Sequence, residues 1–322
     1  MAVTRTTRET RVKQAFYRGD TLTLENSVYR QSVLALTDLL LQDDLASGDL
    51  TAAAMDLEPT RVAASVIARE RGIIAGLEEF ALLYRGCGVD VVLEMRDGDP
   101  IAPGDTVLLA QGDQTKLLAL ERVGLNLLQR MSGIATASHC AQERVRKSGS
   151  DTRIIGTRKT AWGLLDKRAL HLGGAGTHRL NLGDAILIKN NHLALLANRE
   201  EDAAPLAIQR AWKLRDRAAF IEVEVRSEAA ARAGAAAFRS LLEPSDDEYP
   251  CVLMLDNMSP AQIGAAIEML RRENLWDFAL VEASGGISES NCLDYADSGA
   301  DAISIGALTH SVRALDLSQR IS

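Results

Sequence analysis

The stretch FIEVEVRSEAAARAGAAAFRSLLEPSDDEYPCVLMLDN, residues 220–257, decides the fold. It begins with an apolar run at 220–225, continues with an alanine-rich segment of helical character at 227–242, and ends with a second apolar run at 251–255. A strand, a helix and a strand in this order predict a parallel pair, because the helix supplies the crossover that parallel strands need. The apolar runs indicate a sheet that is buried on both faces.

The same alternation continues on both sides of this unit. Further apolar runs are RIIGT (153–157), AILIK (185–189), FALVEAS (278–284) and DAISIG (301–306). Helices fit between the runs at 203–218, 259–273 and 288–298, and Ser259-Pro260 and Ser288 are typical helix starts. About six such units in roughly 170 residues predict an α/β barrel or a doubly wound sheet.

The chain before this region has a different pattern of apolar residues. Residues 31–46 carry leucines at helical spacing, and residues 117–146 form a longer apolar-periodic segment in which Gly133 is a candidate break. Between them, residues 61–113 indicate strands separated by turn signals, with a helix at 77–87. We therefore predict a small α/β domain with an antiparallel sheet ahead of the parallel one.

The bulk composition limits the partners. The chain has 322 residues, a formal net charge of −8 and a pI of about 5.3, which argues against a nucleic-acid or membrane-surface binder. No apolar run is long enough to span a bilayer. The cysteines are scattered without metal-ligand spacing and indicate reduced thiols in a cytoplasmic protein. The basic first 20 residues lack the apolar core of a secretory signal, and we interpret them as an extension that is flexible or held by a partner subunit.

Polar residues follow or end nearly every apolar run of the second half. In chain order they are Arg158 and Lys159, Lys189, Glu222 and Glu224, Asp256, Ser284 with Gly285 and Gly286, and Gly306. In α/β barrels the active site lies at the carboxyl ends of the strands. Polar ends on six consecutive strands would be unusual for packing alone, so the pattern favours a functional site.

The residue types at these ends make a chemical set. Arginine and lysine bind anions, and the candidates are Arg158, Lys159, Arg179 and Lys189, with His178 beside them. The oxygen ligands Glu224 and Asp256 suit Mg²⁺, with phosphate oxygens completing its shell. The glycine-rich ends at 284–286 and 306–308 precede helix-like segments and leave backbone N–H groups free to bind phosphate.

Several residues near these ends have a structural interpretation that competes with the functional one. Glu222 is as consistent with a structural ion pair as with a site role. A lone histidine such as His192 or His310 is more often structural than catalytic. Lys167 and Arg168 are interpreted as solvated helix residues.

At this point the chain resembles a known family, the quinolinate phosphoribosyltransferases, also called nicotinate-nucleotide pyrophosphorylases (carboxylating). The matching stretches cover most of residues 30–315 and are LLQDDLASGDLT, ERVGLNLLQRMSGIAT, GTRKT, GGAGTHRLNLGDAILIKNNH, IEVEV, LMLDN, EASGGI and ISIGALTHS. The resemblance implies an α/β fold with an N-terminal α/β sandwich domain and an incomplete, seven-stranded α/β barrel. It also implies homodimers or hexamers of dimers, in which each active site is completed by the neighbouring subunit.

The resemblance further implies a pentosyltransferase of NAD biosynthesis. The family's reaction joins quinolinate to phosphoribosyl pyrophosphate and yields nicotinate mononucleotide, pyrophosphate and CO₂, with Mg²⁺ as the cofactor. Carried over by motif, Arg158, His178 and Arg179 would hold the quinolinate carboxylates, and Arg122 would reach in from the partner subunit. Lys159 and Lys189 would lie between the two substrates, Glu224 and Asp256 would face the ribose and Mg²⁺, and Ser284, Gly285, Gly286 and Gly306 would bind the phosphates.

The expected division is an extension at 1–20, the sandwich domain at 21–126, the barrel at 127–310, and a C-terminal segment at 311–322 that packs back on the N-terminal domain. The sequence departs from the family pattern at Trp162, at Thr177 and in a shortened 163–167 segment. Two alternatives follow from these departures. One is a molybdenum-locus pyrophosphorylase-like relative with a different substrate, against which the retained Lys189 argues; the other is a non-catalytic ligand-binding paralogue.

Overall fold

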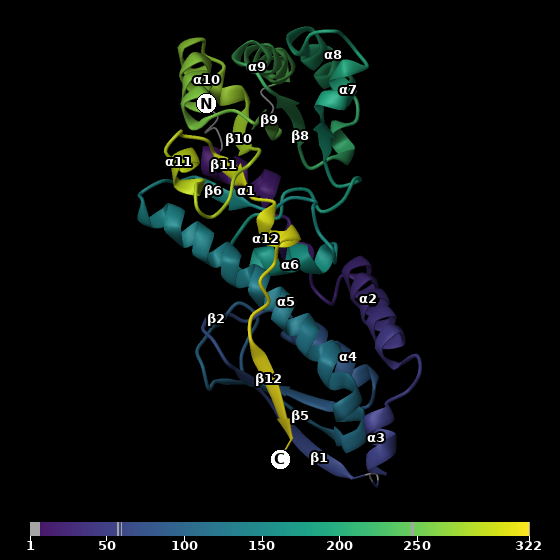
Figure 1. Ribbon diagram of the computed structural model, residues 1–322. Helices are drawn as coiled ribbons and strands as arrows, with labels where there is room; N and C mark the ends of the chain where they lie inside the picture. The colour runs from purple at the N-terminus through teal and green to yellow at the C-terminus, as the bar shows by residue number, and fades with distance from the viewer. Residues whose placement is uncertain (1–6, 57, 59, 246–247, 322) are drawn as a thin grey trace, which may run out of the picture. The chain divides into compact units, whose positions relative to one another are not determined.

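The chain folds into two units that alternate along the sequence (Figure 1). The computed structural model describes residues 7–56, 58, 60–245 and 248–321. One unit comprises the described parts of Met1–Arg18, Cys140–Lys159 and Ala175–Ala307, and the other comprises those of Gly19–His139, Thr160–Gly174 and Leu308–Ser322. These units differ from the predicted division, because residues 160–174 belong with the N-terminal sheet and residues 7–18 belong with the parallel sheet. Among the described residues, no helix has the length and apolar character that a membrane crossing requires.

A four-stranded antiparallel sheet forms the centre of the second unit. Its strand order is β12 (Leu317–Ile321), β1 (Arg61–Ala68), β5 (Thr106–Asp113) and β3 (Asp90–Leu93). The short strands β2 (Gly72–Ile73) and β4 (Pro100–Ile101) pair separately. The helices are α2 (Ser27–Leu45), α3 (Leu50–Met55), α4 (Leu77–Gly86), α6 (Leu164–Leu172) and α12 (Ala307–His310), with a 3₁₀ turn, η1, at Gly19–Thr21. The antiparallel sheet predicted for residues 61–113 is thus present, and β12 from the C-terminus extends it along β1.

Helix α5 (Gln114–Lys147) is continuous through Gly133, where the sequence suggested a break. The glycine serves a close approach instead, because a Cβ at this position would lie 2.2 Å from the carbonyl oxygen of Arg313. A larger residue would therefore displace the segment that leads into β12.

A parallel sheet of six strands forms the centre of the first unit. The order is β6 (Arg153–Ile155), β11 (Ala302–Ser304), β10 (Leu280–Ser284), β9 (Cys251–Asp256), β8 (Ile221–Val225) and β7 (Ile186–Ile188). The described residues provide six strands rather than the predicted seven, because the seventh position is filled only by an isolated parallel bridge between Gly176 and Ile155 of β6. The arrangement is a barrel-like sheet that is open between Gly176 and β7.

Helices follow the strands in alternation, as the sequence predicted. They are α7 (Asn190–Ala194), α8 (Glu200–Trp212), α9 (Glu228–Leu242), α10 (Pro260–Arg272) and α11 (Cys292–Ala296), with 3₁₀ turns η2 (Arg215–Arg217), η3 (Glu243–Ser245) and η4 (Trp276–Phe278). Ser259 caps α10 by accepting from the N–H of Gln262, as predicted. Ser288 does not cap a helix, because α11 begins only at Cys292 and Ser288 belongs to the turn before it.

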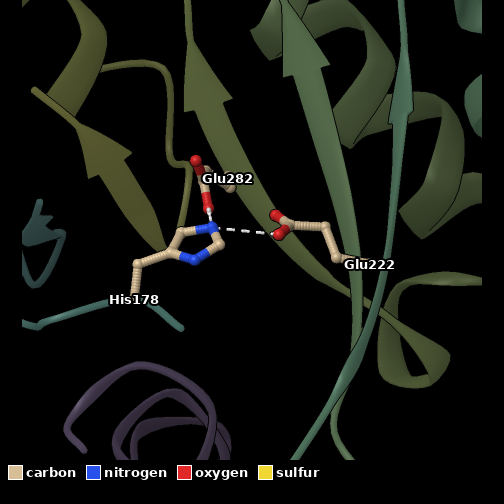
Figure 2. Close-up of side chains that lie close together, drawn as sticks. All are labelled: His178, Glu222 and Glu282. Carbon is tan, nitrogen blue, oxygen red and sulfur yellow. Dashed lines mark ion pairs between the residues drawn. The ribbon is translucent and has the colours of Figure 1, made fainter. Parts of the chain in front are cut away.

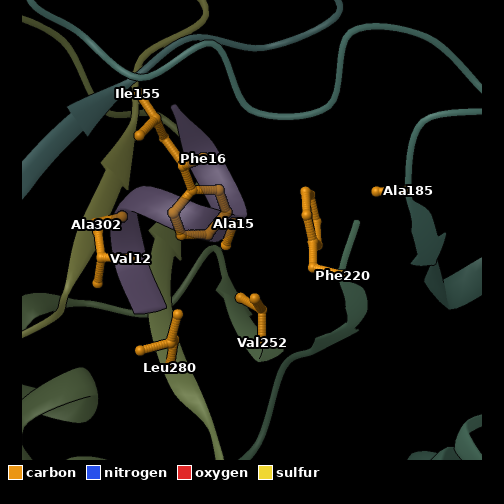
Figure 3. Packing of buried hydrophobic residues seen from close by; sticks show 9 residues of the cluster. All are labelled: Val12, Ala15, Phe16, Ile155, Ala185, Phe220, Val252, Leu280 and Ala302. Carbon is orange, nitrogen blue, oxygen red and sulfur yellow. The ribbon is translucent and has the colours of Figure 1, made fainter. Parts of the chain in front are cut away.

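The N-terminal residues correct a prediction. Of the segment interpreted as an extension, Arg8–Phe16 form helix α1, which is part of the core of the parallel-sheet unit (Figure 3). Val12, Ala15 and Phe16 follow the i, i+3, i+4 spacing of one helix face and are buried. They pack with side chains that include Ile155, Phe220, Val252, Leu280 and Ala302. Arg8–Phe16 contain only these three apolar residues among charged and polar ones, and the sequence pattern was therefore too weak to show the helix.

Candidate active site

A cavity of about 320 Å³ lies in the parallel-sheet unit, at the carboxyl ends of its strands. Among the predicted site residues, those that line it are Arg158, Lys159, His178, Arg179, Lys189, Glu224, Asp256 and Ser284. The remaining lining residues are Thr157, Leu187, Met254, Glu282 and Ser304. Parallel strands end at one edge of a sheet, and this is why residues far apart in the sequence meet here.

The strand register explains which side chains face the cavity. Glu224 lies opposite Met254, Met254 opposite Glu282, and Ser284 opposite Asp256. Opposed residues of a sheet project to the same face, and so do residues two apart on one strand. This face is apolar at Val252 and Leu280, near the strand starts, and polar toward the strand ends. Glu282 could have been found by counting back two residues from Ser284, and Ser304 by counting back two from Gly306.

The cavity has cationic and acidic parts. Burial lowers the pKa of Arg179, and the nearby charge of Arg158 lowers it further. Burial raises the pKa of Glu224, and the charge of Asp256 adds to this effect. A bound cation would relieve the repulsion between these two carboxylates, and hard oxygen donors on neighbouring strands fit Mg²⁺. The donor set therefore suits the predicted metal.

His178 lies between two buried glutamates from different strands (Figure 2). Its Nε2 is 3.0 Å from Oε2 of Glu222 and 3.3 Å from Oε2 of Glu282. Burial disfavours a charge on the histidine ring, whereas the two carboxylates favour a proton on Nε2. Burial and the charge of Glu282 raise the pKa of Glu222 to about 8, against the effect of His178. Glu222 is thus a buried partner of the His178 ring and does not line the cavity.

The segment that carries His178 is tied to the core by its backbone. The N–H of His178 donates to the carbonyl oxygen of Phe16 over 3.1 Å, and the Thr177 hydroxyl lies 3.1 Å from the same oxygen. The Thr177 hydroxyl also accepts from the N–H of Arg18. His178 itself has a φ of 55°, which is uncommon for a residue with a side chain. Thr177, one of the departures from the family pattern, therefore links this segment to the end of α1.

Some predicted site residues are not among those that line the cavity. Gly285 and Gly286 follow Ser284 in a turn with φ values of 97° and 63°, and Gly306 directly precedes the four-residue helix α12. Five residues separate Gly286 from the start of α11 at Cys292, so the predicted helix start directly after the glycines is absent. Arg122 belongs to the other unit, where it is exposed and lines a separate hollow that includes Asp49.

The other unit also contains the altered loop with Trp162. Asp166 accepts hydrogen bonds from the N–H groups of Ala161 and Trp162 and a bidentate pair from Arg130. The Arg130 guanidinium lies over the Trp162 ring, 5.1 Å from its centroid. These contacts connect the loop to Arg130 of α5 and Asp166 of α6.

The interpretation of Lys167 and Arg168 as solvated residues is wrong. Lys167 is 1% exposed, and the Arg168 side chain is 11% exposed and lies 3.8 Å from Glu78. Helix α6 is buried on most of its circumference, so its charged residues wrongly suggested that it was exposed to solvent. His192 accepts the N–H of Lys189 at Nδ1 and has the structural role expected of it.

Comparison with known proteins gives one consistent family. The family described as "Quinolinate phosphoribosyl transferase, C-terminal domain" matches residues 134–320, and its N-terminal domain matches residues 49–132. The chain is similar to the nicotinate-nucleotide pyrophosphorylase (carboxylating) of Mycobacterium leprae, with 38% identity over 86% of this chain and 93% of that one. The human protein of the same name is 31% identical over 90% of this chain and 92% of its own. The crystal structure of NadC from Streptococcus pyogenes matches with a TM-score of 0.76 and 32% identity, over 90% of this chain and 96% of that one.

Proposed function

Because the chain belongs to the quinolinate phosphoribosyl transferase family, we propose that it transfers the phosphoribosyl group of phosphoribosyl pyrophosphate to quinolinate. Loss of one carboxylate as CO₂ then gives nicotinate mononucleotide, with pyrophosphate as the other product. The observation that carries the proposal is the gathering of Arg158, Lys159, Arg179 and Lys189 with Glu224 and Asp256 in one cavity. A reaction between two anions needs this arrangement, because cations offset the work of bringing them together.

The cationic side of the cavity is assigned to quinolinate. Arg158 and Arg179 are forked donors that fit a carboxylate with two parallel hydrogen bonds. Lys159 and Lys189 provide point charges that can face both the pyridine dicarboxylate and the phosphorylated sugar. Leu187 and Met254, which line the same cavity, provide apolar surface for a flat ring.

The acidic side is assigned to the sugar. As pyrophosphate leaves, the ribose C1 gains positive charge, and Glu224 and Asp256 stabilise that charge electrostatically. Mg²⁺, when held by these carboxylates and substrate oxygens, supplies charge neutralisation for the leaving pyrophosphate. Ser284 and the backbone of Gly285, Gly286 and Gly306 are assigned to the phosphate groups.

Decarboxylation follows from the first step. When the ring nitrogen bonds to C1 of ribose, it becomes cationic. The electron pair that the departing CO₂ leaves on the adjacent ring carbon is stabilised by this charge until the carbon takes a proton from water. The protein therefore needs no general base of its own for this step. Its contribution is to hold the ring so that the nitrogen and C1 meet.

The functional assembly is proposed to be a homodimer or a hexamer of dimers. Arg122, exposed in its own chain, would supply a further cation to the active site of the partner subunit. Apolar side chains on α2 and α3 are exposed and fit a surface buried between subunits, including Leu39 (61%), Leu50 (82%) and Met55 (61%). The cysteines Cys87, Cys140, Cys251 and Cys292 form no disulfide among the described residues and fit a reducing, cytoplasmic compartment.

The test is turnover by the purified protein with quinolinate, phosphoribosyl pyrophosphate and Mg²⁺, following nicotinate mononucleotide by mass. We expect product from quinolinate and none from nicotinate, loss of product in Lys159→Ala, and full activity in the control Lys213→Ala, which changes an exposed lysine far along the chain. A folded protein that forms no product would contradict the proposal. It would favour the relative with another substrate or the non-catalytic paralogue.

A further inference from the structure

We propose that Glu282, together with Glu222, is a positioning residue of this active site. The two carboxylates fix the ring of His178, and through that ring they fix the main chain from which Arg179 reaches the cavity. The inference rests on the proposed function, since it assigns Arg179 to a carboxylate of quinolinate. Neither glutamate was among the predicted substrate-binding residues.

Both nitrogens of the His178 ring are engaged within the protein. Nε2 faces the carboxylates of Glu222 and Glu282 at 3.0 and 3.3 Å, and Nδ1 accepts the N–H of Arg179 over 2.6 Å. An acceptor at Nδ1 requires the ring proton to be on Nε2. The two carboxylates therefore act as acceptors that hold this proton, and with it the orientation of the ring.

The faces of the ring are fixed as well. The ring centroid of His178 lies 5.5 Å from that of Phe16 and 5.4 Å from that of Phe220. Phe16 belongs to α1 and Phe220 directly precedes β8. A ring packed against two aromatic side chains and bonded at both nitrogens has one available position, and side chains in packed interiors rarely leave such positions.

The ring position is transmitted to Arg179 through the backbone. The φ of 55° at His178 turns the chain, and the bond from the Arg179 N–H to Nδ1 stabilises this conformation. Arg179 then places Nη1 3.3 Å from the carbonyl oxygen of Ala185. Its Nε has no hydrogen-bond partner among the described residues, although Arg179 is only 7% exposed and lines the cavity. A buried guanidinium donor without a partner is suited to an anionic ligand.

The same three residues also have the composition of a metal site, since their ligand atoms lie within 4.8 Å of one another. The hydrogen bond at Nδ1 argues against that assignment. A metal ion on Nε2 would need the lone pair of that nitrogen, and the ring proton would then have to stand on Nδ1, where the N–H of Arg179 already points.

The experiment compares Glu282→Met with Glu282→Gln in steady-state kinetics. Glutamine keeps an acceptor for Nε2 and methionine does not. We expect Glu282→Met to raise the KM for quinolinate by about 10-fold or more, with the KM for phosphoribosyl pyrophosphate changed less than about 3-fold. Glu282→Gln should restore most of the quinolinate affinity. Glu268→Met, which removes an exposed carboxylate from α10, is the matched control and should change neither constant.

A double-mutant cycle with His178→Phe tests whether Glu282 acts through the histidine. We expect Glu282→Met to add less than about 2-fold to the quinolinate KM once His178 is replaced, because coupled residues are not additive. Multiplying effects would overturn the proposal, as would equal losses for both substrates or a drop in kcat alone. If Glu282→Met does not fold, Glu222→Met gives the same test, since its carboxylate also contacts Nε2. Wild-type turnover is measured first, so that failure of the proposed function is seen separately.

Discussion

The docking of α1 can be tested by truncating Phe16 to alanine. Phe16 is fully buried, and its ring contacts the rings of Phe220 and His178. Removing a buried phenylalanine side chain costs about 3 to 5 kcal/mol, through lost apolar burial and the cavity left behind. The contact of Phe16 with two aromatic rings places the expected loss toward the upper part of that range.

The assay is urea unfolding followed by tryptophan fluorescence, with Phe16→Leu and Lys13→Ala as controls. Leucine keeps most of the volume and should cost about 1 to 2 kcal/mol, whereas Lys13 is exposed on the same helix and should cost less than about 0.5 kcal/mol. Because Phe16 also packs on His178, the variant should bind quinolinate more weakly. A loss of stability below about 1 kcal/mol for Phe16→Ala would refute the reasoning, since it would mean that α1 is not part of the core.

Three further changes have defined outcomes. Burial, followed by the charge of Asp97, raises the pKa of Glu79 from 4.5 to about 7, so the folded state binds a proton more tightly than the unfolded state. Wild-type stability should therefore fall as the pH rises from about 4.5 to 7, and Glu79→Gln should remove up to about 3 kcal/mol of this loss in urea titrations at pH 5 and pH 8. Asp166→Asn should cost about 2 to 4 kcal/mol in the same assay, because it breaks the buried pair with Arg130; an unchanged midpoint would contradict this. Arg179→Lys should raise the quinolinate KM by about 10-fold or more, since lysine lacks the forked donor, and steady-state kinetics would check this.

Most strands of the parallel sheet and most residues of its cavity could be predicted from the sequence. Six apolar runs predicted the strands, because a parallel sheet that is buried on both faces requires apolar residues. Their polar ends predicted the site, because ligands bind at the carboxyl ends of such strands. The helices with clear caps, such as α10 after Ser259, were also predicted closely. These features depend on local spacing, and local spacing is visible in one sequence.

The features that were missed depend on contacts between distant residues. Helix α1 is held in the core because Phe16 packs against Phe220 and against strands that are distant in the sequence. The spacing of Glu282 from Ser284 indicates the face on which it lies, but its pairing with His178 is a contact with a distant part of the chain. Lys167 is buried where α6 packs. A charged residue is usually exposed, so its sequence position did not indicate this burial. No periodicity records such pairings.

The opening of the barrel-like sheet between Gly176 and β7 has a consequence for how this protein can evolve. Between them, Arg179 donates to the carbonyl oxygen of Ala185, just ahead of β7, and the same residue lines the cavity. A change of this residue that suits a new ligand would therefore also change its contact with the segment that leads into β7. Arg158 lines the same cavity but is exposed. A lineage that changes its substrate should therefore vary first at Arg158 and last at Arg179.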